Sequence, residues 1–127
     1  MKIGALSRAT GLPVATLRFY ESEGLLESRR TSGNYRDFSQ DAVSRAERIC
    51  LYRSLDLTIP EIRTMLRLAE TPTQSCDQVC ALVRRHLEKV ARQRQHLQTL
   101  ETELERLLSI CPGASTSGSC QILAELS

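Results

Sequence analysis

The sequence predicts a mainly α-helical fold, in which a winged helix-turn-helix domain is followed by one long helix and a short cysteine-bounded loop. Three observations predict it. Two short helical segments meet at a glycine turn near residue 11, and a polar turn with basic neighbours follows near residue 33. Further along, apolar residues recur every seven positions between residues 83 and 104, which is typical of a helix that packs against another helix.

The first two helices are short. Residues 3–10 form the first, Gly11 and Leu12 the turn, and Pro13 begins a second helix that stops at Gly24. Proline is tolerated in the first turn of a helix because the N–H that it lacks would have no partner there. Glycine commonly follows the last helical residue. Two such helices joined by a glycine turn are typical of a helix-turn-helix.

The next segment predicts a β-hairpin, or wing. Residues 32–34 are Ser-Gly-Asn, which favour a turn. Arg29 and Arg30 precede this turn, and Tyr35 and Arg36 follow it. A short hairpin with a basic surface is therefore expected.

Two more helices complete the first domain. Ser39 is expected to cap a third helix that runs to about Arg53. Thr58 and Glu61 have the spacing of a capping box, in which each side chain binds the other residue's backbone N–H at a helix start. We therefore expect residues 1–70 to form a winged helix-turn-helix DNA-binding domain.

A long helix is expected over residues 73–110. Ser75 and Gln78 form a second possible capping box, and no Gly or Pro interrupts the chain until Pro112. The heptad stripe consists of Val83, Val90, Leu97 and Leu104. One helix alone leaves this stripe in water, so it indicates a partner, most simply a second copy of the chain. A packed intrachain tail is the alternative.

The composition limits the function. The net charge of +2 is small, 41% of residues are hydrophobic, and no apolar run approaches the roughly 18 residues that a membrane span needs. The N-terminus has no apolar signal segment, so we expect a cytoplasmic protein without membrane association whose five cysteines are reduced. The two histidines both fall on the long helix and suggest no nucleophile with its base, so we expect no enzyme.

Candidate DNA contacts lie on the second helix and the wing. Thr16, Arg18 and Tyr20 can project away from the apolar face of their helix and reach phosphates or a groove. The alternatives are that Arg18 is a solvated surface residue and that Tyr20 or Tyr35 belongs to the core. Residues 1–70 carry only a small excess of basic residues, so order and spacing predict DNA binding more strongly than charge does.

The ordered segments LRFYESEGLL, GNYR and RSLDLTIPEIR resemble the MerR family of transcription regulators, and the resemblance covers essentially the whole chain. It implies an antiparallel coiled-coil dimerisation helix. It also implies a homodimer that binds double-stranded promoter DNA and, on binding its effector, distorts the DNA so that RNA polymerase can initiate. The implied DNA contacts are Thr16, Arg18 and Tyr20 on the recognition helix, Tyr35 and Arg36 on the wing, and Arg53.

Three cysteines are the candidate metal ligands. Cys76 and Cys111 are 35 residues apart, or five heptads, so they lie on the same side of the long helix but about 52 Å apart. One chain cannot bring both to one ion, whereas two antiparallel copies can. Cys120 returns on the loop as a third thiol, so residues 111–127 are expected to form a metal-binding loop with a short terminal helix.

Three thiolates suit a soft divalent ion. The spacing of the two loop cysteines and the closing CQILAEL most resemble the cadmium- and lead-responsive branch of the family. Mercury-responsive members share the three-cysteine plan, and the zinc-responsive branch usually has a loop histidine that is absent here, so mercury and zinc remain alternatives. Cys80, one helical turn after Cys76, is either a fourth ligand or an inert thiol. Cys50 is expected to be a small core residue.

Two other functions remain open. A regulator of the same fold could sense oxidation through a Cys111–Cys120 disulfide, without metal. A metal-buffering protein with a vestigial DNA-binding domain would bind metal but would show no salt-sensitive affinity for a promoter.

Overall fold

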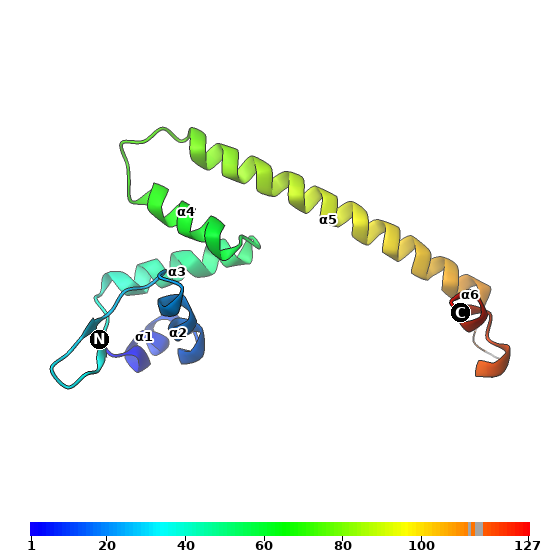
Figure 1. Ribbon diagram of the computed structural model, residues 1–127, viewed down its shortest axis with the longest axis horizontal. Coiled ribbons are helices and arrows are strands. Elements are labelled where there is room, and N and C mark those ends of the chain that lie inside the picture. The colour runs from blue at the N-terminus through cyan, green and yellow to red at the C-terminus, as the bar shows by residue number, and fades with distance from the viewer. Residues whose placement is uncertain (112, 114–115) are drawn as a thin grey trace. The chain divides into compact units, whose positions relative to one another are not determined.

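The computed structural model describes residues 1–111, 113 and 116–127. Its contacts divide it into two compact units, Met1–Val79 and Cys80–Ser127. Figure 1 shows the helices, together with the small hairpin of the first unit. None of the described helices is long and apolar enough to cross a membrane. The expected mainly helical fold with a wing and a long C-terminal helix is confirmed.

The first two helices form the expected helix-turn-helix. Helices α1 (Ile3–Thr10) and α2 (Val14–Ser22) pack against each other. Gly11 adopts a φ of +74° between them, a left-handed conformation that glycine reaches without steric cost. Pro13 has an extended backbone and precedes the first residue of α2. Gly24, just beyond α2, also has a positive φ of +75°, as expected for a residue that ends a helix.

The wing is a two-stranded antiparallel hairpin of β1 (Arg29–Arg30) and β2 (Arg36–Asp37). Thr31 and Tyr35 close its turn, because the Thr31 N–H donates to the Tyr35 carbonyl at 2.9 Å. Asn34 has a φ of +62°, a conformation that asparagine tolerates better than most residues. The expected wing is therefore present.

Helices α3 (Asp41–Ser54) and α4 (Ile59–Ala69) complete the first unit. Thr58 and Glu61 form the expected capping box, with bonds of 2.9 and 3.3 Å. The predicted Ser39 cap is wrong, because α3 begins two residues later and Gln40, which flanks it, makes no side-chain cap. The largest fully buried side chains form one core: Leu6, Leu17, Leu25, Leu26, Phe38, Ile49, Ile62 and Leu66.

Helix α5 (Asp77–Ile110) is one continuous helix of 34 residues (Figure 1). At its start the Asp77 N–H donates to Ser75 Oγ at 3.1 Å, whereas in the predicted capping box the donor is the Gln78 N–H, one residue later. After α5 come a single 3₁₀ turn, η1 (Ser117–Ser119), and a short helix, α6 (Gln121–Glu125). Pro112, Ala114 and Ser115 of the expected loop lie outside the described residues.

Helix α5 carries a stripe of apolar side chains that are 41% to 70% exposed, here called the α5 stripe. Its members are Val83, Leu87, Val90, Leu97, Leu100, Leu104 and Leu108. In contrast, Leu82 and Leu107 on the same helix are buried. The heptad residues expected to face a partner are thus exposed in the single chain.

Candidate DNA interface and thiol pair

A basic hollow of about 600 Å³ lies between α1, α2 and the wing. Each of the three elements brings cations to it, so the hollow presents positive charge from one continuous surface. The cations lining it are Lys2, Arg8, Arg18, Arg30 and Arg36. A concave cationic surface beside a recognition helix suits a phosphate backbone.

Tyr35 is held at the wing tip from two sides. Its ring is 61% exposed, and the Lys2 ammonium lies 4.8 Å from the ring centroid, within cation–π distance. A Cβ added at Gly33 would lie 3.2 Å from the ring edge, so the ring packs closely over the glycine. The expected wing residue Tyr35 is therefore exposed, with Lys2 beside its ring.

Arg36 is tied to the recognition helix. Its Nε donates to Glu21 Oε1 at 2.5 Å, and Ser28 Oγ donates to the other oxygen of the same carboxylate. Burial alone would raise the pKa of the Glu21 carboxyl, but these two hydrogen bonds outweigh it. With the nearby charges of Arg36 and Arg30, they hold the pKa below its ordinary value. Glu21 thus links α2 to the wing.

Tyr20 differs from its two neighbours in the expected contact set. It is buried, with 6% of its surface exposed, whereas Arg18 is exposed and Thr16 is partly exposed. Burial is the main cause that raises the pKa of the Tyr20 phenol, and Cys50 adds to it while Arg53 opposes it. The tyrosine therefore packs largely in the core, which was the alternative to a DNA contact.

Two residues near Tyr20 complete this side of the first unit. Arg53 is exposed at the end of α3, and its guanidinium donates to the Leu57 carbonyl at 3.2 Å. Cys50 is exposed, so its expected place in the core is wrong. The buried stripe of α3 runs through Ala42, Ala46 and Ile49, and the residue after Ile49 faces away from it.

The sequence interpretation missed Lys2 and Arg8. Neither lies in the recognition helix or the wing, yet both line the hollow. Arg8 is on α1, which packs against α2. The signal available in the sequence was one basic residue, Arg8, in the last turn of α1. The sequence alone does not show that this turn faces the wing.

In the second unit, two of the expected metal ligands meet. Cys111 Sγ and Cys120 Sγ lie 3.7 Å apart, and both residues are partly buried. Cys111 directly follows α5 and Cys120 directly precedes α6, so the pair lies where the end of one helix meets the start of the other. Zn–S bonds of about 2.3 Å at a tetrahedral angle put two sulfurs about 3.8 Å apart. The pair therefore fits two ligands of one soft ion.

Cys76 and Cys80 are both exposed. Cys76 directly precedes α5, and Cys80 is in its first turn. Within residues 1–111, 113 and 116–127 of one chain, no three His, Cys, Asp or Glu side chains gather at a metal-binding distance.

Comparison with known proteins decides the family. The family model for MerR HTH family regulatory proteins matches residues 1–69, and a second model, MerR, DNA binding, matches residues 43–107. The chain belongs to the MerR family. It is a metal-responsive transcription regulator of this family and not an enzyme, and the resemblance seen in the sequence is confirmed.

Relatives of this MerR-family chain match over most of its length. It is 36% identical to the HTH-type transcriptional regulator ZntR homolog of Haemophilus influenzae, over 84% of this chain and 80% of that one. It is 32% identical to the HTH-type transcriptional regulator HmrR of Rhizobium leguminosarum, over 100% and 98%. Among solved structures, the transcription regulator PbrR691 of Ralstonia metallidurans in complex with lead(II) is 41% identical, with a TM-score of 0.90 over 100% of this chain and 99% of that chain.

Proposed function

We propose that the protein is a homodimeric regulator that binds promoter DNA and activates transcription when a soft divalent ion, cadmium or lead, binds thiolates at each end of the paired α5 helices. The observation that carries this proposal is the Cys111–Cys120 pair at 3.7 Å. The lead(II) complex of the 41% identical PbrR691 supports the choice of ion.

The DNA contacts proposed are the exposed or partly exposed members of the expected set. Arg18 and Arg36 line the basic hollow with Tyr35, and Thr16 lies on the same helix as Arg18. Arg53 is proposed as a contact outside the hollow. Tyr20 is proposed to support α2 from the core, with at most its hydroxyl reaching DNA.

The third thiol is proposed to be Cys76 of the partner subunit. Six of the seven residues of the α5 stripe form pairs that are equidistant from the bond between Gln93 and Arg94. These pairs are Val83 with Leu104, Leu87 with Leu100, and Val90 with Leu97. Cys76 and Cys111 are equidistant from the same point. In an antiparallel pair of α5 helices centred at that point, each paired apolar residue of one helix lies beside an apolar residue of the other. Cys76 of one subunit then lies level with Cys111 of the other.

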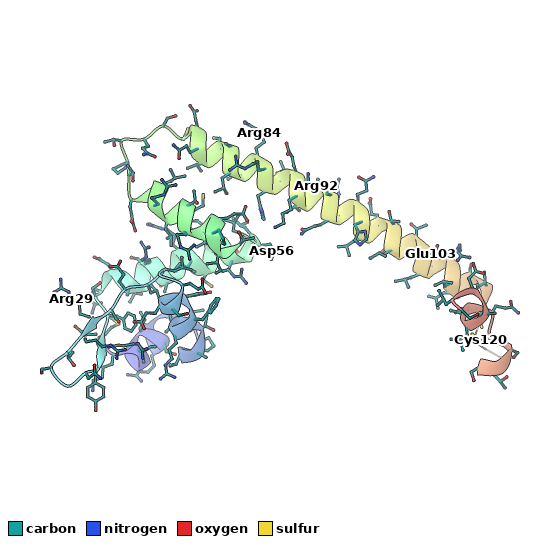
Figure 2. The ribbon with its side chains drawn as sticks, in the orientation of Figure 1. Arg29, Asp56, Arg84, Arg92, Glu103 and Cys120 are labelled. Atoms are coloured by element: carbon teal, nitrogen blue, oxygen red, sulfur yellow. The ribbon has the colours of Figure 1, made fainter. Side chains whose placement is uncertain are left out.

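The charges of α5 favour the same orientation. Between residues 83 and 94, five cations accompany one carboxylate, whereas residues 97–108 carry three carboxylates and one cation. Figure 2 labels Arg84 and Arg92 on the first of these segments and Glu103 on the second. An antiparallel pair sets each basic segment beside an acidic one, and a parallel pair would set like charges together.

The donor set determines the ion class. Two thiolates from Cys111 and Cys120, with a third from the partner subunit, give a soft site that selects cadmium, lead, mercury or zinc over hard ions. When bound, the ion supplies charge compensation for the thiolates and joins the two subunits. Cys80 is proposed to stay outside the site. RNA polymerase at the promoter is the proposed partner of the DNA complex.

The test is transcription from one promoter fragment with purified protein and RNA polymerase, titrated separately with cadmium, lead, mercury and zinc. Activation at the lowest free concentration by cadmium or lead supports the proposal. Preference for mercury or zinc would reassign the effector. Titration of Cys80→Ser should give the same order of ions and nearly the same midpoints, whereas a selective loss for cadmium would make Cys80 a ligand.

A second candidate function rests on the same thiol pair. Two thiols 3.7 Å apart can also form a disulfide, so the protein could respond to oxidant instead of metal. In the transcription assay, activation by oxidised glutathione in the presence of a chelator would support this alternative.

A further inference from the structure

Arg106 joins the last turns of α5 to the terminal helix. Its guanidinium binds Glu103 on α5 at 2.7 and 3.1 Å, and it also binds Glu125 on α6 at 3.0 Å. The contact with Glu125 spans 19 residues of sequence and is here called the clasp. Figure 2 shows Glu103 on this end of α5 and Cys120 on the returning segment.

The clasp contacts a helix that is too short to be stable on its own. Helix α6 has five residues, and an isolated helix of this length does not persist in water because nucleation costs more than one turn recovers. The Leu123 and Leu126 side chains at this end remain exposed, so apolar burial by them contributes little. Because Ile122 is the partly buried apolar residue of α6, its packing and the clasp are the contacts that can keep α6 in place.

The position of α6 determines the position of a thiol. Cys120 is the residue directly before α6, and its carbonyl accepts a hydrogen bond from the Ala124 N–H at 3.1 Å. If α6 moves away from α5, Cys120 moves with it and leaves Cys111. The geometry connects the Arg106–Glu125 contact to the 3.7 Å spacing of the two sulfurs.

We propose that Arg106 is a positioning residue for the metal-binding pair, which acts through Glu125 and α6 to hold Cys120 beside Cys111. The part of this proposal that concerns metal affinity rests on the proposed function, whereas the part that concerns the spacing of the thiols does not. Because the clasp is half exposed, its loss should change the equilibria of the pair by about two- to five-fold.

The first experiment needs no metal. In the full chain with Cys50, Cys76 and Cys80 replaced by Ser, the Cys111–Cys120 disulfide is equilibrated with glutathione in the presence of a chelator. Two protein thiols are oxidised to one disulfide while one oxidised glutathione is reduced to two thiols, so the equilibrium constant gives the effective concentration of one thiol beside the other.

Arg106→Gln and Glu125→Gln should each lower this constant by about two- to five-fold, and the double variant should lose no more than either single one. Glu105→Gln, which removes a neighbouring exposed carboxylate of α5, is the matched control and should leave it unchanged. The charge-reversed pair Arg106→Glu with Glu125→Arg should restore part of the loss, because the new ion pair forms but the carboxylate at position 106 is repelled by Glu103. Equal constants in wild-type protein and both single variants, or additive losses, would overturn the proposal.

The second experiment measures the dissociation constant for cadmium in the protein with all of its natural cysteines. The same two variants should weaken binding by a similar factor, with a smaller effect in high salt because exposed ion pairs are screened. If the two variants change the thiol equilibrium but cadmium does not bind even to wild-type protein, the positioning role of Arg106 is supported and the proposed function is wrong. If cadmium binds and neither equilibrium responds to Arg106, the clasp fails alone.

Discussion

The Glu21 carboxylate on α2 accepts a 2.5 Å hydrogen bond from Arg36 Nε on β2, and so joins the recognition helix to the wing. Ser28 donates to the other oxygen of the same carboxylate. Both elements contribute cations to the basic hollow, and this one acidic side chain of α2 contacts Arg36 of the wing. It also accepts from one donor, the Nε, of Arg36, a cation that lines the basic hollow.

Replacing Glu21 with Gln should lower the free energy of unfolding at neutral pH and make that free energy less sensitive to acid. Because the folded-state pKa of Glu21 lies below its unfolded value, its stabilisation is present above the unfolded pKa and is lost as the pH falls through the folded pKa. Glu21→Gln should therefore cost about 1 kcal/mol at neutral pH and less in acid. Denaturant unfolding between pH 7 and pH 3 measures this difference.

Glu23→Gln is the control for that substitution. It removes the same charge two residues away, from a side chain that lies 3.7 Å from Arg63 at the surface. A loss of stability as large as that of Glu21→Gln, with the same pH profile, would show that the link between α2 and the wing has no special role.

Arg18→Ala should weaken DNA binding about equally across sequences and reduce the slope of affinity against salt by about one. The reason is that Arg18 is exposed on α2 and lines the basic hollow, where it can neutralise one phosphate. Arg67→Ala on α4, an exposed arginine outside that hollow, should leave the slope unchanged. Fluorescence anisotropy on one promoter fragment at several salt concentrations is the measurement, and equal slopes for Arg18→Ala and wild type would remove Arg18 from the interface.

Gly33→Ala should lower DNA affinity without unfolding the protein. The added methyl group would lie 3.2 Å from the Tyr35 ring, so the ring must move by a few tenths of an ångström and its contact with the Lys2 ammonium is weakened. We expect about a three-fold loss of affinity, the size of an exposed cation–π contact. Ser32→Ala, at an exposed neighbouring position of the same turn, is the control. Unchanged anisotropy titrations for Gly33→Ala would show that the position of Tyr35 is unimportant.

Local signals in the sequence predicted much of the fold. The Thr58–Glu61 capping box depends only on residues three apart, and the Gly11 turn depends on one residue that tolerates positive φ. Such features need no knowledge of the tertiary structure, so they could be placed before it was known. The long helix could also be predicted from local features, because heptad spacing and the absence of Gly and Pro are both read from neighbouring residues.

The features that the sequence did not predict depend on which face of a helix packs against the rest of the protein. Tyr20 lies three residues after Leu17 and so shares its buried face, although its hydroxyl made it a candidate contact. Cys50 follows the buried Ile49 and faces outward. Lys2 and Arg8 reach the basic hollow only because α1 packs beside α2 and the wing. The meeting of Cys111 and Cys120 was expected from the metal hypothesis, and the structure shows the two sulfurs together.

The register of the α5 pair can be tested by cross-linking. In the proposed register Val90 lies level with Leu97 of the partner subunit, so Val90→Cys and Leu97→Cys chains should link to each other when mixed and oxidised. Each variant alone should link poorly at the new cysteine, because two copies of the same position are then about 10 Å apart along the helix axis.

The three combinations distinguish the alternatives. Self-linking of Val90→Cys alone, or of Leu97→Cys alone, would indicate an antiparallel pair shifted by one heptad in either direction. Self-linking of both variants would indicate a parallel pair. Mass spectrometry of the linked peptides separates these bonds from those of the natural cysteines.

The thiol site itself is tested with two complementary chains, one carrying Cys76→Ser and the other carrying both Cys111→Ser and Cys120→Ser. Each homodimer should fail to respond to metal, since every shared site lacks at least one thiol. In the heterodimer, Cys111 and Cys120 of the first chain meet Cys76 of the second, so one site is complete and the other has no thiol from this set.

A doubly tagged heterodimer, purified and titrated with cadmium, should therefore bind one ion tightly where the wild-type dimer binds two. A site within one chain predicts none, because neither chain carries all three thiols. The cis arrangement is physically difficult, since Cys76 and Cys111 directly precede and follow a continuous helix of 34 residues, which is about 51 Å long. Tight binding of two ions by the Cys76→Ser homodimer would show that two thiols suffice and that Cys76 is dispensable. Binding of no ion by the heterodimer would disprove the shared site.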